Sequence, residues 1–332
     1  MSTIAFDGIC FGDGPPTGVA RAFADTLAAY VARGEADCVL LLPDGATCPD
    51  LARVRSVRAP RGALRRQRRL PALLRELGAD LLHSPVAAVP LRAPCPTIAT
   101  VHDLPWLHAD APEHTGRWRR FATQRALCSA ARVLAPSTMT ARDAERLLAP
   151  DARRVERVPH GTPAPIAPPP DPATRSGPLL VLGDDRPRKN RARLCAAHAI
   201  ARRRCPDLPD LRFVGPPDDY VDEAEKRRLL RACRVLVHVS LFEGFGLPVL
   251  EGLAHGAPVV CSDLPPHREI ADGCARFVDP RATDGIAAAL LQAHHDEAWR
   301  QRAASAGPLR ARHFRPEHTA AAWTRIHAEV LA

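Results

Sequence analysis

Residues 240–252 read Ser-Leu-Phe-Glu-Gly-Phe-Gly-Leu-Pro-Val-Leu-Glu-Gly, and this stretch decides the fold that the sequence predicts. The residues before it, 235–239, are valine-rich and mostly apolar, which is typical of a buried parallel strand. After it, leucines recur at helical spacing, and Pro248 suits a first helical turn because its missing N–H would have no partner there. A strand, a glycine-rich turn and a helix in this order indicate an α/β sheet that binds its ligand at the carboxyl end of the strand.

Two glycines and two carboxylates give this turn its chemistry. Gly244 and Gly246 allow backbone conformations that other residues resist, and they let a ligand approach the main chain. Glu243 lies in the turn and Glu251 about one turn into the helix, so both can accept hydrogen bonds from the hydroxyls of one sugar-like ligand. The alternative is that Glu243 caps the helix and Glu251 is solvated. The glycine spacing does not match the fingerprint of a dinucleotide site or of a P-loop.

This segment resembles the nucleotide-sugar site of the family 4 (group 1) retaining glycosyltransferases. Their pattern of two glutamates separated by seven residues matches Glu243 and Glu251, and the intervening Gly-Phe-Gly-Leu-Pro-Val-Leu matches as well. The resemblance implies that Glu251 holds the ribose hydroxyls of the donor and that Glu243 holds the sugar. The other donor contacts that it implies are with the backbone of Phe245, Gly246 and Leu247.

A basic loop precedes a helix at the start of the second half of the chain. Residues 179–183 predict a buried strand, and Arg188 and Lys189 follow it, just before a helix expected from Arg191. The helix dipole and two cations together favour a phosphate here, although a basic loop alone is usually mere surface. Pro-Arg-Lys-Asn after such a strand resembles the diphosphate-binding loop of the same family. We therefore assign Arg188 and Lys189 to the diphosphate, where they would stabilise the charge of the leaving group.

Two features of the first half resemble the same family. His102 follows a strand expected at residues 96–101, and a histidine at the carboxyl end of a strand points to the ligand crevice. Thr-Val-His-Asp-Leu is similar to the family's Thr-Ile-His-Asp-Leu, which implies that His102 approaches the transferred sugar. Gly18 precedes a helix expected at residues 19–33, and it is the one position that matches the family's Gly-Ile-Gly-Arg region, where the loop faces the donor phosphates.

The resemblance covers nearly the whole chain and implies two doubly wound, Rossmann-like α/β domains that face each other across a cleft, the GT-B arrangement. A chain of 332 residues is long enough for two such cores. We expect an acceptor-side domain at 1–160, a proline-rich linker at 161–178, a nucleotide-sugar domain at 179–314, and a terminal helix at 315–332 that packs back on the first domain.

The second domain is expected to be short. Only 53 residues separate Lys189 from Glu243, whereas relatives usually have an additional strand and helix in this interval. We therefore expect the C-terminal domain to lack about one βα unit, which in relatives helps to enclose the nucleotide base.

The charge of the chain favours anionic partners. The formal net charge is +9 at pH 7, which suits nucleotide phosphates, an acidic membrane surface or nucleic acid. Basic residues concentrate between Arg53 and Arg75. This stretch has three interpretations, which are a solvated helix face, a surface that docks on anionic lipid headgroups, and a nucleic-acid site. Nucleic acid is not expected, because no interleaved aromatic residues would stack on bases.

Cysteine and histidine spacing argue against a metal or a cofactor. None of the ten cysteines has Cys-x-x-Cys spacing, which favours free thiols in a reducing cytosol. His294 and His295 are expected to be surface residues, because neighbours in a helix do not chelate as an i, i+4 pair does. There is no Asp-x-Asp motif, so we expect metal-independent chemistry with the nucleotide sugar as substrate and no cofactor.

The location expected from the sequence is the cytoplasm, with a peripheral position on the inner face of the membrane as a further possibility. The first residues show no signal-peptide pattern, and no apolar run approaches the ~18 residues of a membrane-spanning helix.

The function that the resemblance implies is transfer of a hexose, with retention, from GDP-mannose or a UDP-sugar to a hydroxyl of a glycan or lipid-linked acceptor. A mannose-like donor and a role in cell-surface polysaccharide synthesis are expected, because this motif combination is common among transferases of that kind. Two alternatives stay open, which are a non-catalytic GT-B homologue that acts as a binding protein and a nucleotide-sugar epimerase.

Overall fold

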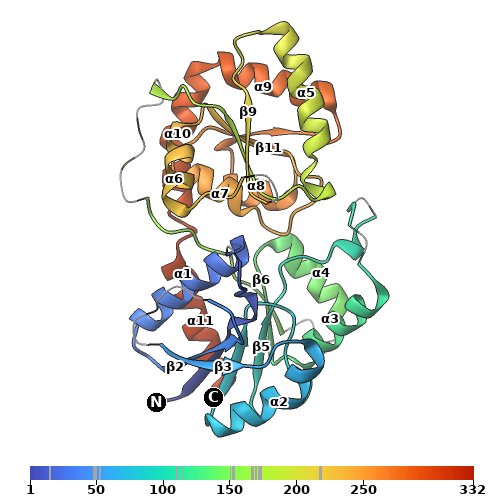
Figure 1. Ribbon diagram of the computed structural model, residues 1–332, viewed down its shortest axis with the longest axis vertical. Coiled ribbons are helices and arrows are strands. Elements are labelled where there is room, and N and C mark those ends of the chain that lie inside the picture. The colour runs from blue at the N-terminus through green and yellow to red at the C-terminus, as the bar shows by residue number, and fades with distance from the viewer. Residues whose placement is uncertain are drawn as a thin grey trace. The chain divides into compact units, whose positions relative to one another are not determined.

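We analysed a computed structural model of the protein. It describes every residue except 15, 48–50, 52–53, 110, 114, 150, 152–153, 166–167, 169, 171–173 and 217–218. The chain divides into two compact units (Figure 1). Unit 1 comprises residues 1–107, 115–161 and 316–332, and unit 2 comprises residues 108–114 and 162–315.

Unit 1 is built on a seven-stranded parallel sheet in the order β3-β2-β1-β4-β5-β6-β7. Its strands are β1 Thr3–Asp7, β2 Asp37–Pro43, β3 Arg55–Ala59, β4 Leu81–Ser84, β5 Thr97–Thr100, β6 Arg132–Ala135 and β7 Val155–Arg157. The central strands are buried on both faces, as their continuous apolar runs predict. The strand order reverses between β1 and β4, which is the mark of a doubly wound sheet.

The helices of unit 1 are α1 Gly18–Ala32, α2 Ala63–Glu76, α3 Arg117–Ser129, α4 Thr138–Leu148 and α11 Pro316–Leu331, with short 3₁₀ turns η1 Gly8–Cys10 and η2 Pro105–Leu107. Side-chain oxygens of Thr17 and Ser137 cap α1 and α4 by accepting from backbone N–H groups. The sequence pattern predicts a helix from Pro112 to Ser129, and its start is wrong, because α3 begins only at Arg117. The preceding residues 108–114 group with unit 2.

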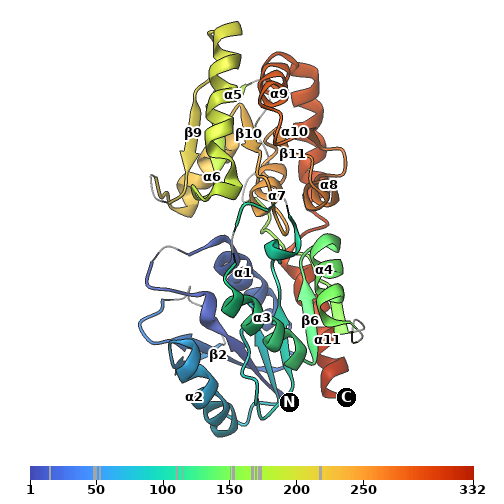
Figure 2. The same cartoon turned by 90° about the vertical axis from the view of Figure 1, so that its right-hand side faces the viewer.

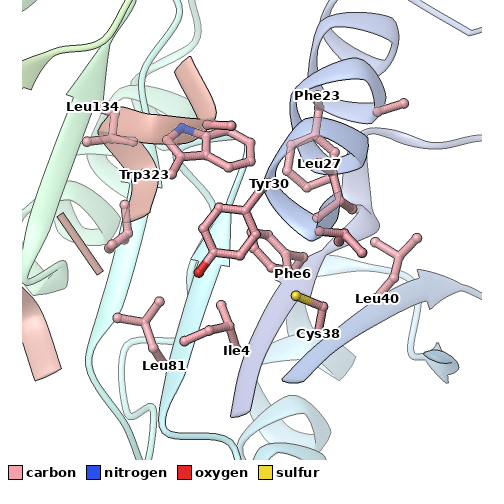
Figure 3. Packing of buried hydrophobic residues seen from close by; sticks show 14 of the residues in the cluster. Ile4, Phe6, Phe23, Leu27, Tyr30, Cys38, Leu40, Leu81, Leu134 and Trp323 are labelled. Atoms are coloured by element: carbon pink, nitrogen blue, oxygen red, sulfur yellow. The ribbon is translucent and has the colours of Figure 1, made fainter. Parts of the chain in front are cut away.

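An aromatic cluster joins the C-terminal helix α11 to the first strand and helix (Figure 3). Trp323 of α11 lies 5.9 Å from Phe6 between ring centroids. His327 of α11 is within hydrogen-bond distance of His83 on β4 and of the Tyr30 hydroxyl on α1, at 2.9 Å in each case. The end of the chain is therefore part of the core of unit 1.

Unit 2 is built on a five-stranded parallel sheet in the order β12-β11-β10-β8-β9. Its strands are β8 Leu179–Leu182, β9 Leu211–Val214, β10 Val235–His238, β11 Val259–Ser262 and β12 Ala275–Val278. Its helices are α5 Arg191–Arg204, α6 Glu223–Ala232, α7 Leu247–Ala254, α8 Pro265–Ala271, α9 Thr283–His295 and α10 Glu297–Ala311, with the 3₁₀ turn η5 Pro187–Lys189. The strand order reverses between β8 and β10, so a ligand crevice is expected beyond the carboxyl ends of these two strands.

Helices cover both faces of the second sheet (Figure 2). On one face α5 and α9 form an apolar core with the strands, and on the other face α6, α7, α8 and α10 do so. Gly252 lets α7 lie close to β10, because a Cβ atom there would come within 2.5 Å of Leu236 Cδ2. The prediction of two doubly wound α/β domains is confirmed.

The expected domain bounds, cysteine state and membrane topology can be compared with the structure one by one. Residues 108–114, which we assigned to the first domain, group with unit 2. The absence of one βα unit stays a prediction, and part of the expected linker lies outside the described residues. The described cysteines are free thiols, whereas Cys48 is among the residues that are not described. Among the described residues, no helix is long and apolar enough to cross a membrane.

Arg175, at the end of the expected linker, stabilises the ends of two helices of unit 2. Its side chain is 1% exposed, and its guanidinium donates to the carbonyl oxygens of Leu230 at 2.8 Å and His255 at 2.7 Å. These carbonyls lie in the last turn of α6 and at the end of α7, where no intrahelical N–H is available.

We expect Arg175→Met to lower the free energy of unfolding of the protein by about 3 kcal/mol, because it leaves buried carbonyls without donors. Arg228→Met, which removes an exposed arginine of α6, is the control and should cost less than about 0.5 kcal/mol. Denaturant unfolding of both variants measures the difference. Equal effects would contradict this role of Arg175.

The two histidines between β4 and α11 make the stability of unit 1 depend on pH. Burial lowers the pKa of His327 to about 4, and burial with the neighbouring imidazole holds the pKa of His83 well below its usual value. In the unfolded chain both histidines have a pKa of about 6.5, so acid protonates the unfolded state first. Their contribution is therefore fully present above about pH 6.5 and is lost as the pH falls towards 4.

We expect the free energy of unfolding to decrease between about pH 6.5 and pH 4, and to decrease less steeply in His327→Phe. Denaturant unfolding at a series of pH values gives the two slopes. The same slope in both proteins would show that His327 does not contribute.

Candidate functional site

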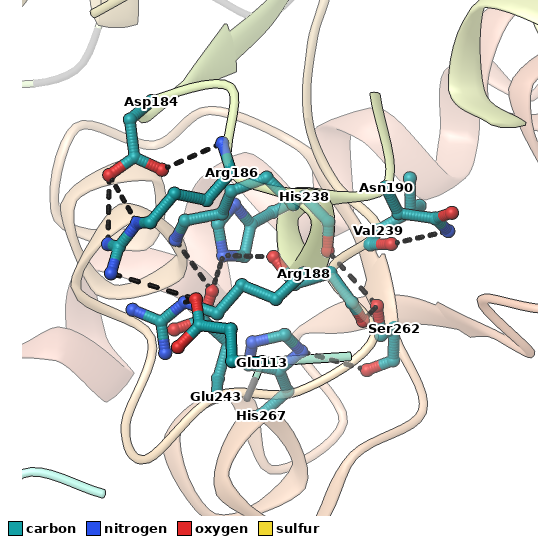
Figure 4. A network of polar contacts seen from close by, with 12 residues as sticks. Glu113, Asp184, Arg186, Arg188, Asn190, His238, Val239, Glu243, Ser262 and His267 are labelled. Carbon is teal, nitrogen blue, oxygen red and sulfur yellow. Dashed lines mark hydrogen bonds and ion pairs between the residues drawn. The ribbon is translucent and has the colours of Figure 1, made fainter. Parts of the chain in front are cut away.

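The loops that follow β8 and β10 meet at the point where the strand order of unit 2 reverses (Figure 4). The N–H of Leu241 donates to the carbonyl oxygen of Arg188 at 2.7 Å. Asn190 has left-handed backbone angles that separate η5 from α5, and its side-chain amide donates to the carbonyl oxygens of Val239 at 3.0 Å and Pro280 at 2.7 Å. The basic loop is thus fixed to the glycine-rich turn by buried hydrogen bonds.

Lys189 and Glu243 form an ion pair between these two loops. Lys189 Nζ lies 2.7 Å from Glu243 Oε1, and the two side chains are 14% and 9% exposed. His238, at the end of β10, donates from Nε2 to the same carboxylate oxygen at 3.2 Å. Burial by itself would raise the pKa of Glu243, but Lys189, His238 and Arg188 outweigh it and hold this pKa well below its usual value. Glu243 is therefore an ionised hydrogen-bond acceptor at neutral pH.

Arg188 contacts the carboxylate of Glu113, which was not among the residues predicted for the site. Arg188 is 8% exposed, and its Nε lies 3.1 Å from Oε1 of Glu113, which also lies 3.7 Å from Nη1 of Arg186. Glu113 belongs to the segment 108–114, whose His108 ring packs 5.1 Å from that of Phe242. Glu113 belongs to no recognisable motif, so only the folded chain reveals that its carboxylate pairs with Arg186 and Arg188 of the basic loop.

Glu251 also has a basic partner. Lys226 of α6 is 7% exposed, and its Nζ lies 2.8 Å from Glu251 Oε1 and 2.9 Å from Glu223 Oε2. Lys226 was not among the residues predicted for the site, although its sequence carries one signal. Lys226 precedes the buried Leu229 and Leu230 at helical spacing, which marks it as a charged residue on an inward-facing side of α6.

The glycine-rich turn before α7 presents main-chain atoms rather than side chains to a ligand. Gly246 has φ +120°, and a Cβ atom there would come within 2.8 Å of His267 Cδ2. His267 is held in place because its Nδ1 donates to the carbonyl oxygen of Ser262 at 2.9 Å. Phe245 is buried in the core, and Leu247 is the first residue of α7. A ligand at this turn would thus contact the main chain.

The remaining candidates, His102 and Gly18, belong to unit 1. His102 donates from Nε2 to the carbonyl oxygen of Pro85 at 2.7 Å, and its Nδ1 lies 3.1 Å from His160 Nε2. Burial lowers the pKa of His102, so the ring is neutral at pH 7. Both of its nitrogens are therefore engaged within unit 1. Gly18 is the first residue of α1.

The structure brings Arg188, Lys189 and Glu243 together, with Glu251 on the helix that follows.

Two family models match the chain. The model described as Glycosyltransferase Family 4 matches residues 16–164, and the model described as Glycosyl transferases group 1 matches residues 174–296. Together the two matches cover most of the chain, one in each half.

Several curated proteins match part of the chain. It is 36% identical over 104 residues to O-antigen chain mannosyltransferase B of Escherichia coli, a match that covers 31% of this chain and 26% of that protein. It is 35% identical over 141 residues to a phosphatidyl-myo-inositol mannosyltransferase of Mycolicibacterium smegmatis, which covers 36% of each. These matches span well under half of the length of the curated relatives.

Solved structures match the fold over the whole chain. Sucrose-phosphate synthase from Thermosynechococcus elongatus has a TM-score of 0.79 at 18% identity, with 99% of both chains covered. Anabaena Alr3699/HepE, solved in complex with UDP-glucose, has a TM-score of 0.73 at 17% identity, with 99% of this chain and 100% of that chain covered. At these identities the matches show a shared fold.

A diphosphate that binds Arg188 has to displace the carboxylate of Glu113, so we expect Glu113→Gln to bind UDP and GDP several-fold more tightly than the unchanged protein. Isothermal titration with both nucleotides measures the change. Glu297→Gln, which removes the same charge from the first turn of α10, is the control and should have no effect. Weaker binding in Glu113→Gln would instead show that this carboxylate supports the site.

Proposed function

Because the chain belongs to the family 4 and group 1 glycosyltransferases, we propose that it transfers a hexose from a nucleotide-diphosphate sugar to a hydroxyl of a glycan or lipid-linked acceptor, with retention of configuration. The observation that carries this proposal is the buried contact of Lys189 with Glu243 beside Arg188. The two basic side chains and the carboxylate of Glu243, which accepts hydrogen bonds, lie at the strand-order reversal of unit 2, where such sheets bind ligands.

The donor would bind by exchanging partners with these charges. Its diphosphate takes the place of Glu113 on Arg188, near the start of α5, whose N-terminus also favours an anion. The ribose hydroxyls donate to Glu251, which Lys226 contacts in this structure. The sugar hydroxyls donate to Glu243 and contact the backbone of residues 245–247.

In the reaction, the bond between the anomeric carbon and the diphosphate oxygen breaks while the acceptor oxygen bonds to the same face of that carbon. Negative charge grows on the leaving diphosphate, and Arg188 and Lys189 stabilise it in a partly dry site. The acceptor proton passes to an oxygen of the leaving diphosphate. Glu243, ionised and held by Lys189 and His238, serves to position the sugar and not as a nucleophile. His102 would line the acceptor side.

A mannose-like donor and a role in cell-surface polysaccharide synthesis are part of the proposal. Support comes from the named activities of two partial relatives, which are both mannosyltransferases. HepE, whose fold is similar, was solved with UDP-glucose, so a UDP-sugar is the competing donor. We further expect the reaction to need no metal and no cofactor, because two basic residues of the chain stand where the charge develops.

The basic stretch would place the enzyme on the inner face of the membrane. On α2, Arg65, Arg68 and Arg69 are exposed and could meet anionic headgroups. Arg66 is not available for this, because it is buried in an ion pair with Asp7. Arg53, at the start of the stretch, lies outside the described residues.

Two substitutions separate donor binding from turnover. We expect Glu251→Ala to weaken binding of the nucleotide sugar about tenfold, and Lys189→Ala to lower kcat about 100-fold with a smaller change in KM. Steady-state donor hydrolysis and titration with GDP-mannose, UDP-glucose and UDP-N-acetylglucosamine give both numbers. Unchanged kinetics in both variants would refute the site.

The same measurements test the two alternatives. If the unchanged protein binds none of these nucleotide sugars, it is no transferase for these donors, and a non-catalytic homologue is favoured. If an epimerised nucleotide sugar accumulates without an acceptor, the protein is an epimerase. Glycosylated acceptor with the anomeric configuration of the donor supports the proposal.

A further inference from the structure

A second cluster of reactive side chains lies where two helices of unit 2 end. Cys205 is the residue after α5, and His294 and His295 are the last two residues of α9. One ligand atom from each of these three side chains lies within 4.8 Å of the other two. The two helices share one apolar core, so their packing brings Cys205 to the two histidines although it is far from them in the sequence.

Asp207 adds a carboxylate to this cluster. The thiol of Cys205 donates to Asp207 Oδ1 at 2.9 Å, and His294 Nε2 lies 3.3 Å from Asp207 Oδ2. Asp207 therefore contacts two of the three side chains, so that four side chains of the types that bind transition metals are neighbours. The sequence expectation that His294 and His295 are only surface residues overlooked these partners, since neither Cys205 nor Asp207 is near them in the chain.

The cluster is sheltered on one side and open on the other. Cys205 is 5% exposed and the His294 side chain 11%, whereas the Asp207 side chain is 78% exposed. The Nδ1 atom of His294 is buried without a hydrogen-bond partner. His295 is exposed. A solvated ion can therefore reach the cluster, while the inner ligands are held by the protein.

The electrostatics of the cluster suit a divalent cation. The carboxyl ends of α5 and α9 carry partial negative charge. Arg234 and Arg300 donate to the carbonyl oxygen of His294 and offset part of it. A thiolate at Cys205 and the carboxylate of Asp207, with two neutral imidazoles, would balance the two positive charges of one such ion.

We propose that Cys205, Asp207, His294 and His295 form a binding site for one zinc-like divalent cation, separate from the nucleotide-sugar site. Thiolate and imidazole ligands favour zinc over magnesium or calcium. In a tetrahedral zinc site with ligand bonds of about 2.0–2.3 Å, donor atoms are roughly 3.5 Å apart. The exposed side chains of His295 and Asp207 can close the remaining distance by rotating. The ion would tie the ends of α5 and α9 together.

The test uses the full-length protein, freed of metal with a chelator and then titrated with zinc chloride. We expect one zinc ion per chain with a dissociation constant in the micromolar range or below, and a rise of several degrees in the midpoint of thermal unfolding at saturating zinc. Cobalt(II) should give the intense absorption of tetrahedral thiolate coordination.

Cys205→Ser and His295→Gln should each weaken zinc binding at least about tenfold. Because His295 is exposed, His295→Gln is expected to fold normally even if Cys205→Ser does not. Cys195→Ser removes an exposed thiol from α5, the helix that Cys205 follows, and is the matched control, which should bind zinc like the unchanged protein. Zinc binding that is absent from the unchanged protein, or is unaffected by both cluster substitutions, would overturn the proposal.

Discussion

The contact on which the candidate site depends is the buried ion pair of Lys189 and Glu243. It joins the loop after β8 to the loop after β10, at the point where the sheet order of unit 2 reverses. Both charges are largely removed from water, and removing one partner of such a pair typically costs about 3–5 kcal/mol. His238 and Asn190 complete the arrangement by satisfying the carboxylate and the neighbouring backbone. These contacts join the two loops into one defined site.

Every charge assigned to the nucleotide sugar already has a partner within unit 2. Glu113 forms an ion pair with Arg188, Lys226 with Glu251, and Lys189 with Glu243. Because buried charges are unfavourable when unpaired, these contacts keep the charged groups stable before a ligand binds. In the proposed function, donor binding would be an exchange of ionic partners, and its affinity would depend on the difference between two sets of contacts.

Much of the fold could be predicted because its elements are local. The valine-rich strand β10, the glycine turn and the helix α7 all follow from short-range patterns, and so does the basic loop before α5. The helix α3 was predicted to begin at Pro112 rather than at Arg117, because the grouping of residues 108–114 with unit 2 depends on contacts between distant segments. The partners of the site residues were missed for the same physical reason, since contacts between distant segments leave no periodic signal.

The sequence by itself indicated the order of strands and helices and the residues at the ends of β8 and β10, because hydrophobic periodicity and turn chemistry are local properties of the chain. Its resemblance to a known family implied the two doubly wound units. Only the tertiary structure decided which charges face one another. Glu113 meets Arg188, Lys226 meets Glu251, and Cys205 meets His294, each across helices and loops that packing alone brings together. Burial then fixes how these groups behave, since the same carboxylate is a solvated surface group or a paired acceptor according to what surrounds it.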